Sequence, residues 1–155
     1  MGSGLRSGLR GMLKESLIEC QRSFAIALLR ADGSSGFKVE ARRYHLYISL
    51  GCPWAHRTAI MWKLKGLEEV ISLSIVDPVI SEDGWMFSDY SGCLPDFVND
   101  ARYLREVYLK ANPNYTGRVT VPVLWDKQTD LIVNNESRQT FGCLILIFML
   151  WQSQN

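Results

Sequence analysis

The sequence predicts an α/β fold, and two patterns along the chain indicate it. Between residues 44 and 76, a strand pattern, a helix pattern and a second strand pattern follow one another, which is the order of a βαβ unit. Between residues 119 and 133, two β-branched segments flank a short polar turn, which is typical of an antiparallel hairpin. Because a crossover helix makes the two strands that it joins parallel, we expect the first two strands to be parallel neighbours.

Length and charge restrict the classes of partner. With 155 residues the chain has room for one domain of ordinary size, and a second full domain is not expected. Its 17 Lys and Arg residues balance 16 Asp and Glu residues, for a net charge of +1. Such a balance gives no overall field toward nucleic acid or an anionic membrane. We therefore expect small neutral or mixed-charge ligands, with no nucleic acid and no membrane as partner.

Cysteine usage indicates a reducing compartment. The four cysteines are widely spaced and no secretory signal precedes them, so we expect free thiols and a cytoplasmic protein. Residues 1–10 are rich in Gly, Ser and Arg and contain no acidic residue, which resembles a transit peptide and makes the chloroplast an alternative location. A frayed terminus is the other interpretation of this stretch.

The N-terminal extension is taken to cover residues 1–43. Residues 11–30 carry a moderate helix pattern, and the Gly- and Ser-rich residues 31–36 that follow are typical of a flexible loop. The first strand then begins at Tyr44, where apolar residues alternate with more polar ones. This alternation places the side chain of His45 on the solvent side of the strand.

The next elements follow from spacing. Apolar residues recur at helical intervals after Pro53 and predict a helix over residues 53–67, and alternation predicts a second strand over residues 70–76. Residues 77–99 contain several turn dipeptides and form a long irregular segment, a kind that is usually functional or disordered. A helix over residues 101–111 ends at an Asn-Pro pair.

The last elements are the hairpin and the residues after it. We expect its strands over residues 119–125 and 131–133. Residues 134–137, Asn-Asn-Glu-Ser, supply capping groups for a helix that should follow.

Cys52 stands where the first strand passes into the first helix. Pro53 suits a first helical turn, because its fixed φ fits there and its missing N–H would have no partner. We expect the sulfur to face free backbone N–H groups at the positive end of the helix dipole, which favours the reactive thiolate. Free cysteines are more often small buried hydrophobes, but a Gly-Cys-Pro-Trp junction is a poor place for a filler residue.

The surroundings of Cys52 in the sequence also limit its chemistry. Ala55 occupies the position of the second cysteine of a dithiol motif, so Cys52 would work as a monothiol. Cys52 and His56 would need a second pair of ligands to hold zinc, and His45 is the one remaining histidine. We therefore expect no metal.

Four strings in this order resemble the glutathionyl-hydroquinone reductases, the xi-class, omega-like glutathione transferases. They are Cys52-Pro53-Trp54-Ala55, Gly84-Trp85-Met86-Phe87, Tyr115 to Asp126 (YTGRVTVPVLWD) and Ile132 to Ser137 (IVNNES). The resemblance covers residues 44–137 and implies that they form a thioredoxin-like, glutathione-binding domain. It also implies glutathione contacts from Trp85, Arg118, Val121, Glu136 and Ser137.

Each of these implied roles makes chemical sense. A cis Pro122 would leave the backbone of Val121 exposed to pair with the cysteinyl part of glutathione, as an added strand does. Glu136 would bind the γ-glutamyl amine, and Ser137 with free N–H groups of the helix would bind its carboxylate. Arg118 would bind a carboxylate through its planar fork.

Each implied role also has an ordinary alternative. Trp85 could be a hydrophobic plug, Arg118 a solvated charge, and Glu136 with Ser137 a simple helix cap. Three other tryptophans, Trp54, Trp62 and Trp125, are interpreted as packing residues.

The resemblance implies a glutathione-dependent thiol oxidoreductase. Cys52 would attack the glutathione sulfur of a glutathionyl-hydroquinone, release the hydroquinone and leave a Cys-glutathione mixed disulfide, which a second glutathione resolves. Glutathione is then a co-substrate, no metal is needed, and the family's members are homodimers. The alternatives are an omega-like transferase with dehydroascorbate reductase or deglutathionylation activity, and a truncated, non-catalytic isoform.

The ending departs from this family. Residues 138–155 contain no trace of the family's expected helix, and the large helical C-terminal transferase domain is absent. We therefore expect a thioredoxin-like order β-α-β-α-β-β with a degenerate or missing last helix. The apolar run at residues 144–151 is too short to span a membrane and is interpreted as a β-prone tail.

Overall fold

A computed structural model describes residues 37–153 of the chain. The strands in this range are β1 (Tyr44–Ser49), β2 (Ser72–Val76), β3 (Val123–Asp126) and β4 (Leu131–Asn134). The helices in this range are α2 (Pro53–Leu64), α3 (Leu104–Ala111) and α4 (Ser137–Gln152), and a 3-10 turn, η1 (Leu67–Glu69), precedes β2. The predictions for residues 11–30 and 31–36 lie outside the described residues.

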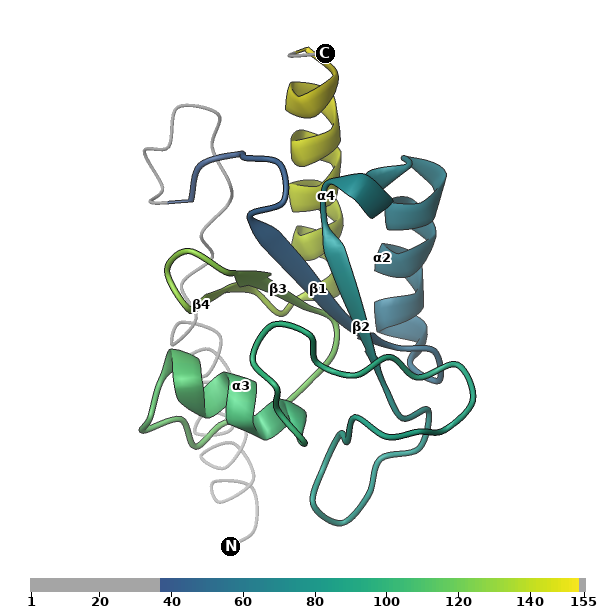
Figure 1. Ribbon diagram of the computed structural model, residues 1–155, viewed down its shortest axis with the longest axis vertical. Coiled ribbons are helices and arrows are strands. Elements are labelled where there is room, and N and C mark those ends of the chain that lie inside the picture. Colours follow the sequence, from purple (N-terminus) through teal and green to yellow (C-terminus); the bar gives the residue numbers. More distant parts are fainter. Residues whose placement is uncertain (1–36, 154–155) are drawn as a thin grey trace, which may run out of the picture.

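The four strands form one mixed sheet in the order β2-β1-β3-β4. β1 is parallel to β2 and antiparallel to β3, and β4 runs antiparallel to β3. Figure 1 shows α2 and α4 side by side on one side of the sheet, with α3 on the other. The predicted βαβ unit and hairpin are both present, and the fold is that of a thioredoxin-like domain.

The central strand β1 is buried on both faces. All six of its residues are buried, because β2 and β3 flank it and helices or loops cover both sides of the sheet. The prediction that His45 faces solvent is therefore wrong: its side chain is fully buried, and its Nδ1 lies 2.7 Å from Ser72 Oγ. Burial, with Lys127 as a further cause, lowers the pKa of His45 to about 3.

Helix α2 is shorter than its sequence pattern. It begins after Cys52 with Pro53 in the first turn, as predicted. It ends at Leu64, because Gly66 takes a left-handed conformation (φ 61°) that a helix cannot continue through. The chain then turns through η1, so β2 begins at Ser72, two residues later than the alternation predicts.

The long segment between β2 and α3 is tied to the sheet. The backbone N–H of Leu104 donates to Trp85 O at 2.9 Å, which joins this segment to the start of α3. The hydroxyl of the buried Tyr47 on β1 donates to Asp96 at 2.9 Å, and the same carboxylate accepts from the backbone N–H of Val98 and Asn99. These bonds hold the segment that carries Trp85 in a fixed position beside the sheet.

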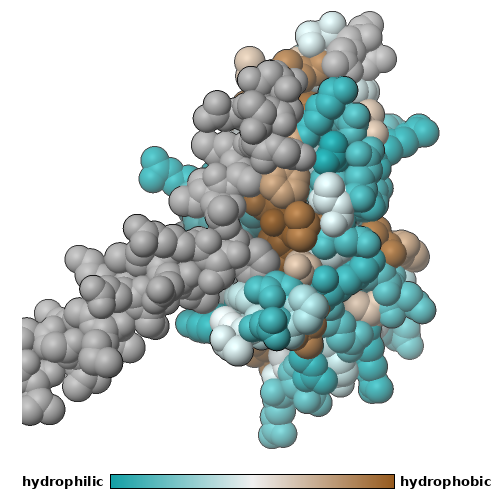
Figure 2. Space-filling view, turned by 90° about the vertical axis from the view of Figure 1, so that its left-hand side faces the viewer, coloured by the Kyte–Doolittle hydropathy of each residue, from teal (hydrophilic) through white to brown (hydrophobic). Residues whose placement is uncertain are grey.

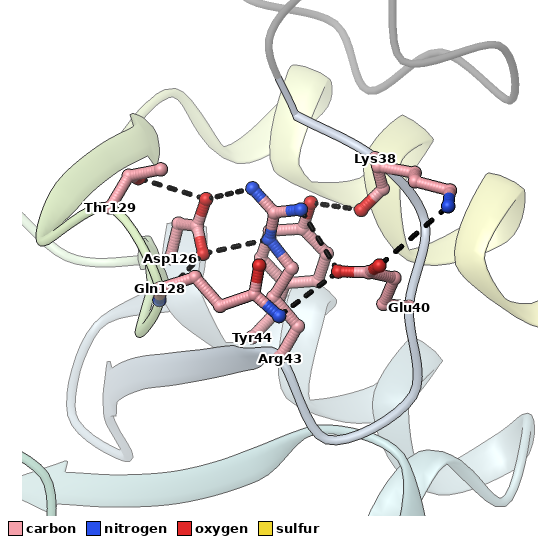
Figure 3. A network of polar contacts seen from close by, with 7 residues as sticks. All are labelled: Lys38, Glu40, Arg43, Tyr44, Asp126, Gln128 and Thr129. Atoms are coloured by element: carbon pink, nitrogen blue, oxygen red, sulfur yellow. Dashed lines mark hydrogen bonds and ion pairs between the residues drawn. The ribbon is translucent and has the colours of Figure 1, made fainter.

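A buried ion pair joins the residues before β1 to the end of β3. Arg43 Nε donates to Asp126 Oδ1 at 2.9 Å, and both side chains are nearly inaccessible to solvent. Figure 3 shows how Glu40 and Thr129 complete the network on either side of this pair. Burial alone would raise the pKa of Asp126, but the hydrogen bonds from Arg43, Gln128 and Thr129 outweigh it and hold this pKa below its ordinary value.

The structure contains a final helix where the sequence suggested that it was degenerate or missing. Residues 137–152 form α4, which packs against α2, and the segment interpreted as a β-prone tail is its second half. The buried residues of α4 lie on one face at helical spacing and are Ser137, Thr140, Cys143, Leu144 and Ile147. This helix fits the capping residues that precede it, and it completes the layer beside α2.

The surface is mixed in character. Figure 2 shows a mainly hydrophilic face, interrupted near its middle by an area of apolar side chains. Within residues 37–153, no helix has both the length and the apolar character needed to cross a bilayer.

Candidate functional site

A cleft of about 430 Å³ opens beyond the end of β1, at the start of α2. Its walls come from four separate segments of the chain, and the residues that line it are Cys52, Trp54, Ile80, Trp85, Arg118, Val119, Thr120, Val121, Pro122, Asn135, Glu136 and Ser137. This set contains Cys52, the implied cis proline and all five residues implied to contact glutathione. The fold therefore gathers into one cleft residues that lie up to 85 positions apart, from Cys52 to Ser137.

Cys52 is the N-cap residue of α2 and is half-buried on the wall of the cleft. Its backbone is extended (φ −98°, ψ 114°), and its carbonyl accepts the first helical hydrogen bond from His56 at 2.9 Å. The sulfur does not contact the N–H groups of the helix, contrary to our expectation. The thiol instead donates to the carbonyl of Val121, with Sγ and O 3.8 Å apart.

This geometry has a simple explanation. Pro53, at the start of the helix, has no N–H, and no other N–H of the helix bonds the sulfur. A thiol keeps its proton as a hydrogen-bond donor, and the Val121 carbonyl is the acceptor that faces it.

The peptide bond between Val121 and Pro122 is cis, as the resemblance implies. Strand β3 was predicted to start at residue 119, but residues 119–122 stay outside the ladder, and pairing with β1 begins at Val123. Pro122 has no N–H to donate to a neighbouring strand, which is one reason for the later start. The four residues line the cleft instead.

Tyr108 of α3 forms hydrogen bonds with two segments of the cleft wall. Its hydroxyl donates to the Thr120 carbonyl at 2.8 Å and accepts from the side-chain amide of Asn135 at 3.2 Å. Thr120 and Asn135 both line the cleft, while Tyr108 itself is fully buried. One hydroxyl group thus connects α3 to two separate segments of the wall.

Glu136 is the N-cap residue of α4. Its Oε1 accepts from the N–H of Arg138 at 3.0 Å and its Oε2 accepts from the N–H of Gln139 at 2.9 Å. Two N–H groups that we expected to be free for a carboxylate of glutathione are therefore occupied. Ser137 is almost fully buried and lines the cleft as the first residue of the helix.

Trp85 and Arg118 lie on other parts of the wall. Trp85 is half-buried, and its carbonyl accepts from the backbone N–H of Leu104 at the start of α3. Its side chain packs against the hydrophobic core and also lines the cleft. Arg118 is exposed, and its carbonyl accepts from the hydroxyl of Tyr115 at 2.8 Å. The Arg118 backbone is thus held while its guanidinium can reach a ligand.

Sequence reasoning missed part of the site. Trp54, interpreted as a packing residue, is 61% exposed and lines the cleft next to Cys52. Ile80 and Asn135 also line the cleft. In the sequence only their positions could have indicated this, because Ile80 lies in the long irregular segment and Asn135 lies beside Glu136. The packing role does hold for Trp125, which is fully buried, and for Trp62, whose indole N–H donates to Ile71 O at 2.8 Å.

The arrangement suits a thiol nucleophile with a bound peptide-like partner. One sulfur faces an apolar cleft with a backbone carbonyl opposite, and carboxylate and guanidinium groups stand at separate parts of the wall. Among residues 37–153, no group of three His, Cys, Asp or Glu side chains could hold a metal ion. A thiol in such a cleft can take part in thiol–disulfide exchange.

Comparison with known proteins agrees with this description. The family described as "Glutathione S-transferase, N-terminal domain" matches residues 51–141, which include every wall segment of the cleft. The glutathionyl-hydroquinone reductase YqjG of Escherichia coli is 56% identical over 108 residues, 69% of this chain and 33% of its own length. The corresponding enzyme PcpF of Sphingobium chlorophenolicum is 53% identical over 115 residues, 74% of this chain and 37% of its own.

Solved structures give the same result. The xi-class transferase of Natrialba magadii superposes with a TM-score of 0.74 at 52% identity, over 77% of this chain and 38% of that one. The glutathione-bound structure of Escherichia coli YqjG superposes with a TM-score of 0.76 at 49% identity, over 80% of this chain and 42% of that one.

Fold and cleft together define a thioredoxin-like domain with a cysteine at a helix N-terminus. The chain belongs to the glutathione S-transferase family, whose N-terminal domain matches residues 51–141. It is similar to the xi-class transferases and to the glutathionyl-hydroquinone reductases. The chain spans about a third of the length of the curated relatives that it matches.

Proposed function

We propose that this chain is a glutathione-dependent thiol oxidoreductase that reduces glutathionyl-hydroquinones to hydroquinones through Cys52. The observation that carries the proposal is the cleft, in which Cys52 faces the backbone carbonyl of Val121 among side chains able to bind a small peptide. Two relatives that are more than 50% identical are named as enzymes of this activity, which supports the choice of substrate.

The reaction consists of a displacement at the thioether sulfur of the conjugate, followed by a thiol–disulfide exchange. In the first, the Cys52 thiolate attacks the glutathione sulfur of the conjugate, and the bond between that sulfur and the ring carbon breaks. The ring carbon takes the electron pair and a proton and leaves as hydroquinone, while Cys52 and glutathione remain joined by a disulfide. In the second, a free glutathione thiolate attacks this disulfide, and Cys52 leaves as thiolate with release of oxidised glutathione.

The wall residues would hold glutathione for both steps. The backbone of Val121 would pair with the cysteinyl residue, which places the glutathione sulfur next to Cys52. Glu136 would bind the γ-glutamyl ammonium, because each carboxylate oxygen keeps lone-pair capacity beyond the one N–H that it accepts. Ser137 would bind the γ-glutamyl carboxylate, Arg118 would pair with the glycine carboxylate, and Trp85 would contact the peptide.

Mass spectrometry after incubation with oxidised glutathione tests the first requirement of this proposal. The parent chain should gain one glutathione, and the Cys52→Ala variant should gain none at the same exposure. The Cys93→Ala variant is the matched control, because Cys93 is also half-buried but lies outside the cleft. Equal modification of the parent and Cys52→Ala chains would refute the proposal.

A second activity has one observation in its favour. An omega-like transferase of Schizosaccharomyces pombe is 50% identical over 103 residues, so dehydroascorbate reduction and deglutathionylation are the alternative reactions. Rates of formation of the Cys52 disulfide from a glutathionyl-hydroquinone and from a small glutathione mixed disulfide separate the two. Faster reaction with the mixed disulfide would favour the omega-like activity.

Steady-state turnover is a separate question. The matched part of this chain covers about a third of the curated relatives, and single-turnover formation of the mixed disulfide can be measured without assuming that the chain completes a cycle. A chain that forms the disulfide but shows no steady-state release of hydroquinone would be a glutathione-binding module without turnover.

A further inference from the structure

A second hollow lies beside the cleft, between α2 and α4. Its volume is about 420 Å³, and it is lined by Arg57, Arg138 and Phe141. Arg57 lies one turn after Trp54 on α2, and its guanidinium stacks over the indole of Trp54 with 5.2 Å between Cζ and the ring centroid. Trp54 lines the cleft and Arg138 directly follows the cleft residue Ser137, so both helices carry neighbouring residues of the cleft and of the hollow.

The charges around this hollow have one sign. Neither Arg57 nor Arg138 forms an ion pair among the described residues, and both side chains are exposed. Helices α2 and α4 contain no Asp or Glu at any position. The acidic residue next to α4 in the sequence is its N-cap Glu136, whose two oxygens accept from backbone N–H groups of the helix.

Paired cations with aromatic neighbours define a specific kind of ligand group. A guanidinium binds a carboxylate through two parallel hydrogen bonds, and a pair of guanidinium groups favours an anion over a neutral group. Trp54 and Phe141 offer flat apolar surfaces on which an aromatic ring can pack. A ring that carries a carboxylate can pack on these aromatic side chains and bind the two arginines.

We propose that Arg57, Arg138 and Phe141 form a subsite for the carboxylate of an aromatic leaving group, so that the preferred conjugates are glutathionyl-hydroquinones with a ring carboxylate. This inference rests on the proposed function. With the glutathione sulfur next to Cys52, the ring lies beyond that sulfur against Trp54, and its carboxylate reaches the two arginines. The resolving glutathione also has carboxylates, so the two exchange steps must be measured separately.

The test compares two conjugates that differ in one charge. They are the glutathione conjugates of 2,5-dihydroxybenzoate and of its neutral carboxamide, and the readout is the single-turnover rate of the Cys52 disulfide, divided by the rate of a small thiol with the same conjugate. We expect the carboxylate to react about fivefold faster than the carboxamide, which is about 1 kcal/mol, the upper range for exposed ion pairs. The preference should fall in 1 M salt, where the Debye length is only about 3 Å.

Charge-matched variants assign the preference to these residues. In an Arg57→Gln, Arg138→Gln double variant the ratio should fall to about 1, and Arg57→Lys should keep part of it. Arg42→Gln removes the same charge from the turn before β1, at the opposite end of that strand from Cys52, and should leave the ratio unchanged. A ratio near 1 in the parent, an unchanged ratio in the double variant, or an effect confined to the second exchange would overturn the subsite.

A binding experiment separates this inference from the proposed function. If neither conjugate modifies Cys52, the proposed function fails, but the subsite still predicts that free 2,5-dihydroxybenzoate binds more tightly than its carboxamide. NMR titration monitored at the indole N–H of Trp54 measures both affinities, and the difference should disappear in the double arginine variant. Equal affinities of the parent for the two compounds would contradict the subsite whatever the activity.

Discussion

At the scale of single residues, Glu136 has two roles that one substitution can separate. As N-cap of α4 its carboxylate accepts from two backbone N–H groups, and as a cleft residue it is proposed to bind the γ-glutamyl ammonium. Capping requires an oxygen acceptor, whereas binding an ammonium is strongest with a negative charge. The ordinary cap interpretation and the ligand interpretation are therefore compatible, because they use different lone pairs of one carboxylate.

We predict that Glu136→Gln leaves most of the stability and weakens reaction with glutathione. The amide oxygen still caps the helix, so the free energy of unfolding should fall by less than about 1 kcal/mol, while Glu136→Ala should cost about 1 kcal/mol through loss of the cap. Urea unfolding measures this difference. Reaction of Cys52 with oxidised glutathione should slow by a similar factor in both variants, and unchanged rates would limit Glu136 to its capping role.

Tyr108 gives a second prediction at this scale. Its hydroxyl bonds Thr120 and Asn135 on two segments of the cleft wall, and it is buried, so Tyr108→Phe leaves a buried carbonyl and a side-chain amide without this partner. We expect a loss of about 1–3 kcal/mol in the free energy of unfolding. The rate of glutathione addition to Cys52 should also fall, because the wall opposite the sulfur loses its support.

The free energy of unfolding and the rate of glutathione addition together show whether the Tyr108 hydroxyl acts on the fold alone or also on the cleft wall. A matched control is Tyr90→Phe, since Tyr90 is 62% exposed and lies outside the cleft. That control should change neither the unfolding midpoint nor the rate. A Tyr108→Phe variant that loses stability but reacts with glutathione like the parent would show that the hydroxyl supports the fold and not the wall.

At the scale of elements, the pattern of the chain predicted the order of strands and helices but not every boundary. The βαβ unit and the hairpin could be predicted from the alternation and spacing of apolar residues, because both elements follow local periodicity. The end of α2 depended on the backbone of Gly66, and the late start of β3 depended on a proline that cannot join the ladder. Each of these two boundaries is set by a single residue, and a periodic pattern read over many residues does not show the effect of one.

Helix α4 shows a different limit. The run from Leu144 to Leu150 is apolar throughout, so it contains no polar residues to reveal a period, and a short apolar run fits a strand as well as a buried helix. The helical signal lay earlier, in the spacing of Ser137, Thr140 and Leu144, and in the N-cap at Glu136. Packing against α2 then decides the conformation of the whole segment.

The docking of α4 can be tested with two substitutions on its two faces. Leu144 is fully buried, so Leu144→Ala should lower the free energy of unfolding by about 2–5 kcal/mol, as large-to-small changes in cores do. Met149 is 61% exposed, and Met149→Ala should change it by less than about 0.5 kcal/mol. Urea unfolding followed by circular dichroism measures both, and equal effects would contradict a docked helix.

At the scale of the whole molecule, the cleft depends on pieces that no single segment contains. Cys52, the Val121–Pro122 peptide and Glu136 come from three parts of the sequence, and the sheet order brings their strand ends to one edge. The resemblance to a family located these residues before the structure did. Trp54, Ile80 and the arginine hollow required the structure, because exposure and the neighbourhood of α2 and α4 are tertiary properties.

The stability of the whole molecule should also depend on acid through His45. In the folded chain burial lowers the pKa of His45 to about 3, while in the unfolded chain it returns to about 6.5. Between these two values the unfolded state binds more protons, so the free energy of unfolding falls as pH falls, by up to about 1.4 kcal/mol per pH unit. Asp126, whose pKa is held below its ordinary 3.8, acts at lower pH, while Glu40 and Glu68, whose pKa values are held below 4.5, also contribute near pH 4.5, so the histidine is identified by comparison with a His45 variant. Urea midpoints between pH 6.5 and 4.5 should drop more steeply for the parent than for His45→Gln, which has no group to protonate.

The His45→Gln variant loses packing and is less stable at pH 7.5, so the slopes of the midpoint against pH are compared and not the midpoints themselves. Parallel slopes would mean that His45 is protonated without cost in the folded chain, and that β1 is less well covered than its burial indicates.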